Sequence, residues 1–363
     1  MVHLLLLAVC AVVIYLACEW FVNAVEWLGV RLRIGPIAVG TVLAAAGTAL
    51  PESVVTFVAV LFGSEEHGAD VGIGAALGGP LVVATISYGV AGWMLLARRR
   101  RGGAAVPVDA AAVAVPDLRP PHPPGHSSEG SPTPDPDDLD GTDTRRLARD
   151  QVWFLVIFAA KVALGLVAFA FKPWLGVLFL VAYGLYFWRE VAGGNEQASG
   201  DDLEPLRFQR SRSVPSTAAV VVQTLVTLVV VFLASQLFVQ QLEFAAPALG
   251  LSPIVVALLL SPIATELPET MNAIIWVRQG KAELALANIS GSMMIQATVP
   301  SALGLFFTPW LFDVPLMLAA VATFAAVAYL LALLRTGRLT PGRLAGATFF
   351  YVAFAVALVV HLA

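Results

Sequence analysis

Long runs of apolar residues, separated by short polar stretches, cover most of this chain. Ten runs are long enough for a helix to cross a bilayer, which takes about 20 residues. They cover residues 4–27, 37–62, 71–97, 151–171, 173–189, 216–242, 251–277, 284–307, 313–334 and 344–362. The pattern therefore predicts an all-α integral membrane protein with ten transmembrane helices.

Two polar segments interrupt this pattern. Residues 102–148 are rich in Pro, Ser, Gly and Asp and have no periodic apolar face, which predicts a disordered linker. Residues 191–214 form a shorter polar loop. The chain is thus expected to consist of 1–101 (helices 1–3), 102–148 (linker), 149–190 (helices 4 and 5), 191–214 (loop) and 215–363 (helices 6–10).

Composition and charge agree with a membrane protein and give it an orientation. Hydrophobic residues make up 58% of the chain, charged residues 13%, and the mean hydropathy is +0.82. Loops on one side carry arginines and lysines from Arg31 to Arg343, whereas the other side has only Lys172. By the positive-inside rule the first side is cytoplasmic, so both termini face outward. We expect a multi-pass protein of the cell inner or plasma membrane, with the lipid bilayer and not nucleic acid as its surroundings.

One segment of the chain occurs twice. Residues 19–53 align without a gap to residues 236–270. The matched positions include Glu26 with Glu243, Thr48 with Thr265, Pro51 with Pro268 and Glu52 with Glu269. Five helices per copy is an odd number, so the second copy enters the membrane with the opposite orientation. The two Pro-Glu pairs are then expected to meet near the midplane across a pseudo-two-fold axis.

The repeated Pro-Glu pairs suggest an ion pathway. A carboxylate inside an apolar run is costly and by default marks an ion or proton route. Proline also frees a backbone carbonyl, and the Thr48 and Thr265 hydroxyls add further hard oxygen donors of the kind Na⁺ or Ca²⁺ requires. Glu52 and Glu269 are the predicted metal ligands, and Glu266 adds a third carboxylate. The alternative is a kinked helix whose glutamate pairs with a basic residue.

The two segments resemble a known family. GTALPES in the first copy, and SPIATELPET followed by ALANISGS in the second, resemble the alpha repeats of the cation/Ca²⁺ exchanger superfamily (the sodium/calcium exchanger membrane region family). The resemblance implies a secondary active antiporter that exchanges Na⁺ or H⁺ for Ca²⁺ or a related cation by alternating access. It places ion-binding roles on Glu52, Glu269, Thr48, Thr265, Asn288, Ser292 and Gln296.

The chain also departs from that family's pattern. The second polar motif of repeat one reads Gly-Ala-Ala-Leu-Gly-Gly-Pro over residues 74–80, with Val83 at its last polar position. Helix 3 therefore offers no side-chain donors there, and Gln296 stands where repeat two usually has Asn or Asp. A degenerate exchanger fold that binds or senses an ion, or supports a partner, without transport is the alternative function.

Lys161 lies in the middle of the fourth apolar run, too deep to reach an interface comfortably. One hypothesis pairs it with Glu52 or Glu266, where it would partly replace a bound cation. The other is a structural pair with Glu19 in helix 1.

Glu26 and Glu243 lie near helix ends, where capping or packing between the repeats is expected. Enzyme motifs such as HExxH are absent from the sequence, so we expect no enzyme and no cofactor. Inorganic cations are the expected partners, and the sequence does not indicate a protein partner.

Overall fold

The computed structural model describes residues 2–49, 53, 68–102, 143–193, 203–245 and 259–362, and all regular structure within them is helical. The elements in chain order are α1 (Val2–Leu32), α2 (Pro36–Ala38), the π-helix η1 (Val39–Ala44), α4 (Gly68–Val82), the π-helix η2 (Val83–Ser87), α5 (Tyr88–Gly102), α6 (Thr144–Gly165), the 3₁₀ turn η4 (Lys172–Leu175), α7 (Gly176–Ala192), the 3₁₀ turn η5 (Arg207–Gln209), α8 (Thr217–Ala245), α10 (Ser261–Thr265), α11 (Leu267–Arg278), α12 (Ala282–Phe307), α13 (Val314–Arg335), α14 (Pro341–Ala345) and α15 (Thr348–Leu362).

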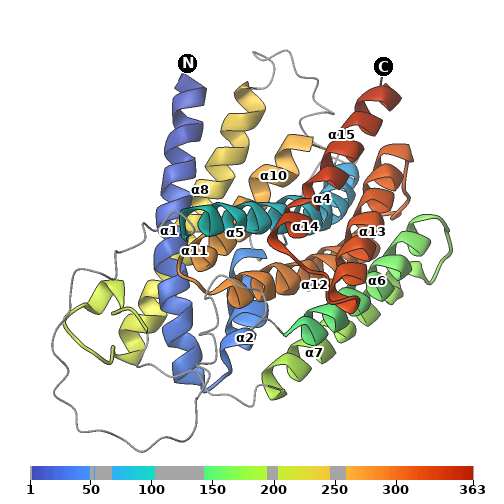
Figure 1. Ribbon diagram of the computed structural model, residues 1–363. Coiled ribbons are helices and arrows are strands. Elements are labelled where there is room, and N and C mark those ends of the chain that lie inside the picture. Colours follow the sequence, from blue (N-terminus) through green and yellow to red (C-terminus); the bar gives the residue numbers. More distant parts are fainter. Residues whose placement is uncertain are drawn as a thin grey trace, which may run out of the picture.

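The helices form two groups. The long helices α1 and α8 lie side by side and run at a steep angle to most of the others (Figure 1). Polar contacts attach α8 and the segment before it to α1: the Trp27 indole donates to Glu204 O at 2.9 Å, and Gln223 of α8 donates to Asn23 at 3.1 Å. The α1–α8 pair is therefore held together at the end of the molecule that carries this segment.

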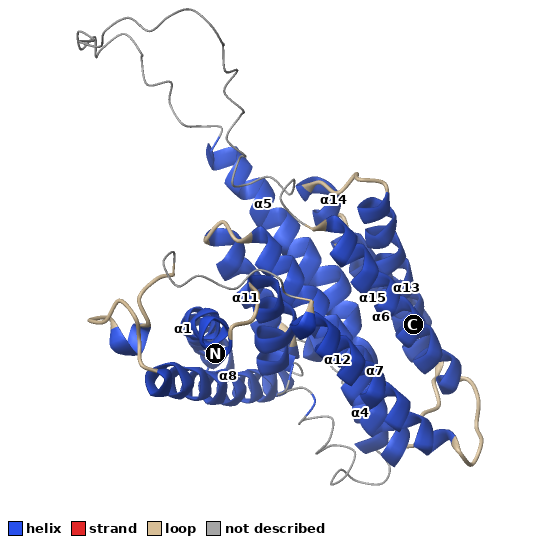
Figure 2. Cartoon of the chain, turned by 90° about the horizontal axis from the view of Figure 1, so that it is seen from below, coloured by secondary structure: helices blue, strands red, loops and turns tan. Residues whose placement is uncertain are grey.

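The other group is a bundle with α12 at its centre (Figure 2). Helix α12 contacts α4, α5, α6, α7 and α11 as well as η1 and η2. Within its 18-residue apolar stretch, 83% of the residues are buried. A helix buried on nearly all sides can carry polar residues only where they meet partners or ligands. Polar side chains on α12 thus mark either a hydrogen-bond network or a site.

Glycine allows the backbones of η1 and α12 to touch. A Cβ atom on Gly291 would lie 2.1 Å from Thr41 O, and one on Gly40 would lie 3.1 Å from Leu284 O. Both values are shorter than ordinary van der Waals contact, so larger residues would force the two elements apart. This close approach brings the first copy of the repeated segment against the second half of the chain.

Seven helices among the described residues are long and apolar enough to cross a membrane. They are Leu5–Leu32, Ala76–Arg99, Lys172–Ala192, Thr217–Gln241, Ala282–Phe307, Val314–Arg335 and Pro341–Leu362. Two other expected spans, 37–62 and 251–277, extend into residues outside the described part of the chain. The fourth expected span corresponds to α6, whose first turns are charged. The number ten therefore stays a prediction.

The expected borders of the linker and of helix 4 were wrong. Helix α5 continues to Gly102, and α6 begins at Thr144 rather than at 151, so residues 144–148 are helical. The carboxylate of Asp143 accepts the N–H of Arg146 at 3.0 Å and caps the helix. Leu147 and Asp150 are buried in these first turns of α6, whose other face is charged. The expected disorder of the segment falls on 103–142, outside the described residues.

The other borders near helix 5 also differ. Helix α6 ends at Gly165, six residues before its expected end, and η4 and α7 cover the fifth run as far as Ala192. The loop expected over 191–214 contains η5.

Candidate ion-binding site

The second Pro-Glu pair lies at a break between two helices. Pro268 has no N–H to donate, so it leaves the carbonyl of Ala264 without its helical partner, and the chain turns at Glu266 between α10 and α11. The N–H of Glu266 still bonds to Pro262 O at 3.0 Å, and Thr270 N bonds to Glu266 O at 3.2 Å. The break places two carboxylates, rather than one, at the start of α11.

Glu266 and Glu269 are both 1% exposed and close enough to repel each other. The side-chain nitrogen of Gln296 donates to Glu266 at 2.5 Å. Neither oxygen of Glu269 has a hydrogen bond of normal geometry within the described structure. Two buried carboxylates in this arrangement require a nearby cation or a bound proton, because buried ions are costly without a partner.

One face of α12 adds neutral oxygen atoms. Asn288, Ser292 and Gln296 follow one another at four-residue spacing, so they share one helix face, and all three are buried. The side-chain oxygens of these three residues form no hydrogen bond in the described part of the chain. Amide and hydroxyl oxygens are ligands that hard cations accept.

The first repeat contributes Thr48. Its hydroxyl lies beside the Glu269 carboxylate, although it donates to Ala44 O at 3.1 Å. Thr265 is half-buried, and its hydroxyl donates to Pro262 O at 3.1 Å. Glu52 lies outside the described residues. The structure thus brings Thr48 of one repeat to Glu269 of the other, and the roles of all these residues stay predictions.

Sequence reasoning missed Asn272. This side chain is fully buried in α11, and neither of its amide atoms has a hydrogen bond among the described residues. It follows Glu269 by three residues and so lies on the same helix face. That spacing was the available signal. Across the bundle, Ser87 of η2 contacts Thr270 at 2.8 Å and ties the first-repeat helix to α11.

Two glutamates of α1 that lie away from the site have specific partners. Glu19 pairs with Arg207 at 3.1 Å, and the structural pair of Glu19 with Lys161 stays a prediction. Glu26 accepts from Trp276 at 3.0 Å and from Lys281 at 2.5 Å. The packing role expected for Glu26 is confirmed, because it joins α1 to the second repeat. The side chain of Glu243 lies outside the described set.

A second buried polar cluster lies near the start of α6. Arg146 and Arg149 both pair with Glu190 of α7, and Ser290 of α12 contacts Asp150 at 3.3 Å. Here Glu190 has two guanidinium partners, unlike Glu269. This cluster therefore neutralises its own charge and is distinct from the candidate site.

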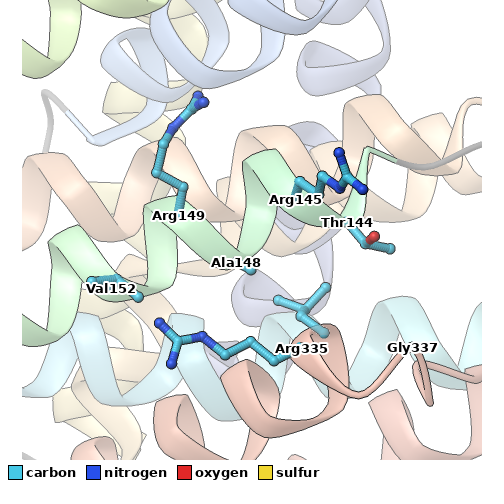
Figure 3. Close-up of a pocket in the computed structure, with 8 residues that line it drawn as sticks. Thr144, Arg145, Ala148, Arg149, Val152, Arg335 and Gly337 are labelled. Atoms are coloured by element: carbon cyan, nitrogen blue, oxygen red, sulfur yellow. The ribbon is translucent and has the colours of Figure 1, made fainter.

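A pocket of about 650 Å³ opens nearby between α6 and α13 (Figure 3). Arg145, Arg149 and Arg335 are among its lining residues, and Arg149 extends away from α13. A lining rich in arginine repels cations, so this pocket is not the cation site.

Among the described residues, no group of three or more His, Cys, Asp or Glu side chains has the arrangement of a metal site. The candidate site therefore combines two described carboxylates with neutral oxygens.

Comparisons with known proteins agree with this fold. Computed family models match residues 2–116 and 219–362 to "Sodium/calcium exchanger protein". "Putative antiporter CaxA" of Alkalimonas amylolytica is 30% identical over 170 residues, which are 45% of this chain and 52% of that protein. The chain thus matches about half the length of this curated relative.

Solved structures of the sodium-calcium exchanger NCX_Mj share the fold at 17% identity, with 98% of both chains covered. The TM-score is 0.67 for the form soaked with 10 mM Na⁺ and zero Ca²⁺, and 0.68 for the form soaked with 2.5 mM Na⁺ and 0.1 mM Ca²⁺. Both repeats fall within the family match, and the apolar helices fit a multi-pass membrane protein. The chain belongs to the sodium/calcium exchanger protein family.

Proposed function

We propose that this protein is a secondary active cation antiporter rather than an enzyme. It would exchange Na⁺ or H⁺ for Ca²⁺ or a related cation at one site near the membrane midplane. The observation that carries the proposal is the buried carboxylate of Glu269, which lies beside Glu266 and has no hydrogen bond of normal geometry in the described structure. Such a group is stable only with a cation or a proton, and a site that accepts either can couple their movements.

The donor set supports a hard cation as substrate. Glu269 and Glu266 supply charge, and the side chains of Asn288, Ser292 and Gln296 supply neutral oxygens from α12. Ca²⁺ takes six to eight oxygen ligands, whereas a proton needs one. Carboxylates that serve both ions make the ions compete, and this competition is the physical basis of antiport.

The same proposal includes a topology of ten helices in two inverted five-helix repeats. Helix α1 begins and α15 ends at the same end of the molecule (Figure 1), as an even number of crossings requires. The arginine distribution favours outward-facing termini in a cell inner or plasma membrane. Alternating access would come from the α1–α8 pair, which packs together as a unit, moving against the bundle around α12.

A second function has one observation in its favour. Helix α4 carries Gly78, Gly79 and Pro80 in the motif where exchangers have polar donors, so the first-repeat half of the site is poorly supplied. The protein would then bind or sense a cation, or support a partner, without net transport. Antiport and cation sensing both use Glu269, and they differ in whether the ion crosses the membrane.

Cation flux in proteoliposomes tests the proposal directly. Gradients of Ca²⁺, Na⁺, K⁺ and Mg²⁺ would be imposed in turn while internal pH is followed, with wild type compared with Glu269→Gln. A matched control is Glu204→Gln, since Glu204 is exposed and paired with Arg207. We expect exchange in wild type and in the control and none in Glu269→Gln. Folded wild type that exchanges no cation under any gradient would contradict the proposal and favour the non-transporting function.

A further inference from the structure

Lys161 places a positive charge inside the bundle. Its side chain has no exposed surface, and its ammonium nitrogen donates to the carbonyl oxygen of Ala76 in α4 at 2.7 Å. The same nitrogen lies 4.8 Å from the centre of the Phe158 ring. A carbonyl oxygen and an aromatic face both attract a cation. These contacts fix the ammonium of α6 against α4.

The acceptor exists because of a proline. An α-helical carbonyl normally accepts the N–H of the residue four positions later, and Pro80, which lies inside α4, has none. Pro80 therefore leaves the carbonyl of Ala76 without its helical partner, and the ammonium of Lys161 takes that place. The proline opens the acceptor and the lysine fills it.

This contact is connected to the candidate site through α10. Leu77, Gly78 and Gly79 separate Ala76 from Pro80, in the segment where the exchangers carry the polar motif of repeat one. Gly78 packs so closely on α10 that a Cβ atom would lie 2.6 Å from Pro262 Cγ. Pro262 in turn accepts the N–H of Glu266. A single helix–helix contact thus connects the segment of α4 that accepts from Lys161 with the segment that carries the carboxylates.

Among the described residues, the two halves of the site are therefore unequal in charge; Glu52 of the first repeat lies outside them. The second repeat offers the carboxylates of Glu266 and Glu269, whereas the described first-repeat motif over residues 74–80 has no polar side chains and holds an ammonium group instead. We propose that Lys161 is a tethered cation of the transport site, which occupies the first-repeat half and leaves the second-repeat oxygens to the mobile cation. This inference rests on the proposed function and makes Lys161 a determinant of how many cations are bound.

The test is the number of cations bound at equilibrium by the purified full chain. Binding of ²²Na⁺ and ⁴⁵Ca²⁺ would be measured for wild type, Lys161→Met, Lys161→Gln and Lys161→Arg. Lys172→Met serves as the control for loss of a buried lysine, since among the contacts described the ammonium of Lys172 bonds only to the carbonyls of Val167, Pro309 and Trp310.

We expect Lys161→Met and Lys161→Gln to bind one more Na⁺ per protein than wild type. Lys161→Arg, which keeps the charge, should match wild type, as should Lys172→Met. In liposomes the Hill coefficient for Na⁺ should rise by about one in the two neutral variants. Folded neutral variants with the wild-type number of cations would overturn the inference and make Lys161 a structural residue.

Thermal unfolding provides a second test if the Lys161 variants are unstable. Thermal unfolding of Lys161→Ala would be followed in Na⁺ and in choline at equal ionic strength. Stabilisation by Na⁺ that exceeds the wild-type effect supports a cation site at this position, whereas equal stability in the two salts overturns it. Flux of wild type is recorded in parallel. If wild type transports and the neutral variants bind the wild-type number of cations, only this inference is contradicted. If wild type does not transport, the proposed function is contradicted, and the binding comparison still decides the role of Lys161.

Discussion

The side-chain amide of Gln296 donates to the carboxylate of Glu266 across the contact between α12 and the α10–α11 break. This bond leaves the amide oxygen of Gln296 without a hydrogen bond in the described structure. One residue therefore positions a carboxylate with its nitrogen and offers an oxygen donor of its own. An aspartate or asparagine, which the family usually has at this point, is one methylene shorter.

Replacing Gln296 with Met should weaken cation binding without preventing folding. The change keeps the size of the side chain but removes both the donor to Glu266 and the free oxygen. A hydrogen bond to a charged group contributes about 1.5–3 kcal/mol, so the cation concentration for half-maximal flux should rise roughly ten-fold or more. Gln151→Met is the matched control, because Gln151 bonds to Tyr88 in the other polar cluster. An unchanged cation dependence in Gln296→Met would remove Gln296 from the site.

A second prediction concerns the contact between η1 and α12. Gly291→Ala would bring a Cβ atom to 2.1 Å from backbone atoms of Thr41, which cannot move aside like a flexible side chain. We expect this substitution to separate the two elements, to lower the thermal midpoint by several degrees and to abolish flux. Gly74→Ala is the comparison, since no atom lies within 4 Å of its added Cβ, and it should behave as wild type. Equal behaviour of the two variants would show that close packing here is not required.

The sequence predicted the parts of the site that depend on local spacing. The four-residue spacing of Asn288, Ser292 and Gln296 and the proline before Glu269 both act within one or two helical turns. Each therefore has a direct structural counterpart in a shared face or a helix break. The same reasoning, applied one turn further, would have found Asn272.

The parts that were missed depend on contacts between distant segments. The bond from Lys161 to Ala76 requires a proline in one helix and a lysine in another, and no local pattern connects them. The start of α6 was missed for a different reason. Its first turns are charged, but Asp143 caps them and the guanidinium of Arg146 pairs with Glu190 of α7. Apolar content alone therefore underestimates a helix whose charges are neutralised by a neighbour.

A third prediction tests the attachment of α1 to the second repeat. Glu26 accepts hydrogen bonds from Trp276 and Lys281, and it is mostly buried. Glu26→Gln should lower the thermal midpoint more than Glu204→Gln, because the latter removes a pair at the exposed surface. A double-mutant cycle with Lys281→Met should give a coupling free energy of about 0.5–3 kcal/mol. Purely additive effects would show that the pair does not hold α1.

The last prediction concerns Lys172, which was expected to be a lone basic residue on the outer side but is buried. Its ammonium donates to Val167 O at 2.6 Å, to Pro309 O at 2.9 Å and to Trp310 O at 2.7 Å, so it joins the turn after α6 to the turn before α13. Lys172→Met would leave three carbonyls without this donor, at a cost of about 1–3 kcal/mol for each one that water does not reach. We expect a lower thermal midpoint and faster proteolysis near 166–171 and 308–313. The cation dependence of flux should stay the same, because these contacts lie away from Glu266 and Glu269. A changed cation dependence with unchanged stability would instead place Lys172 on the ion pathway.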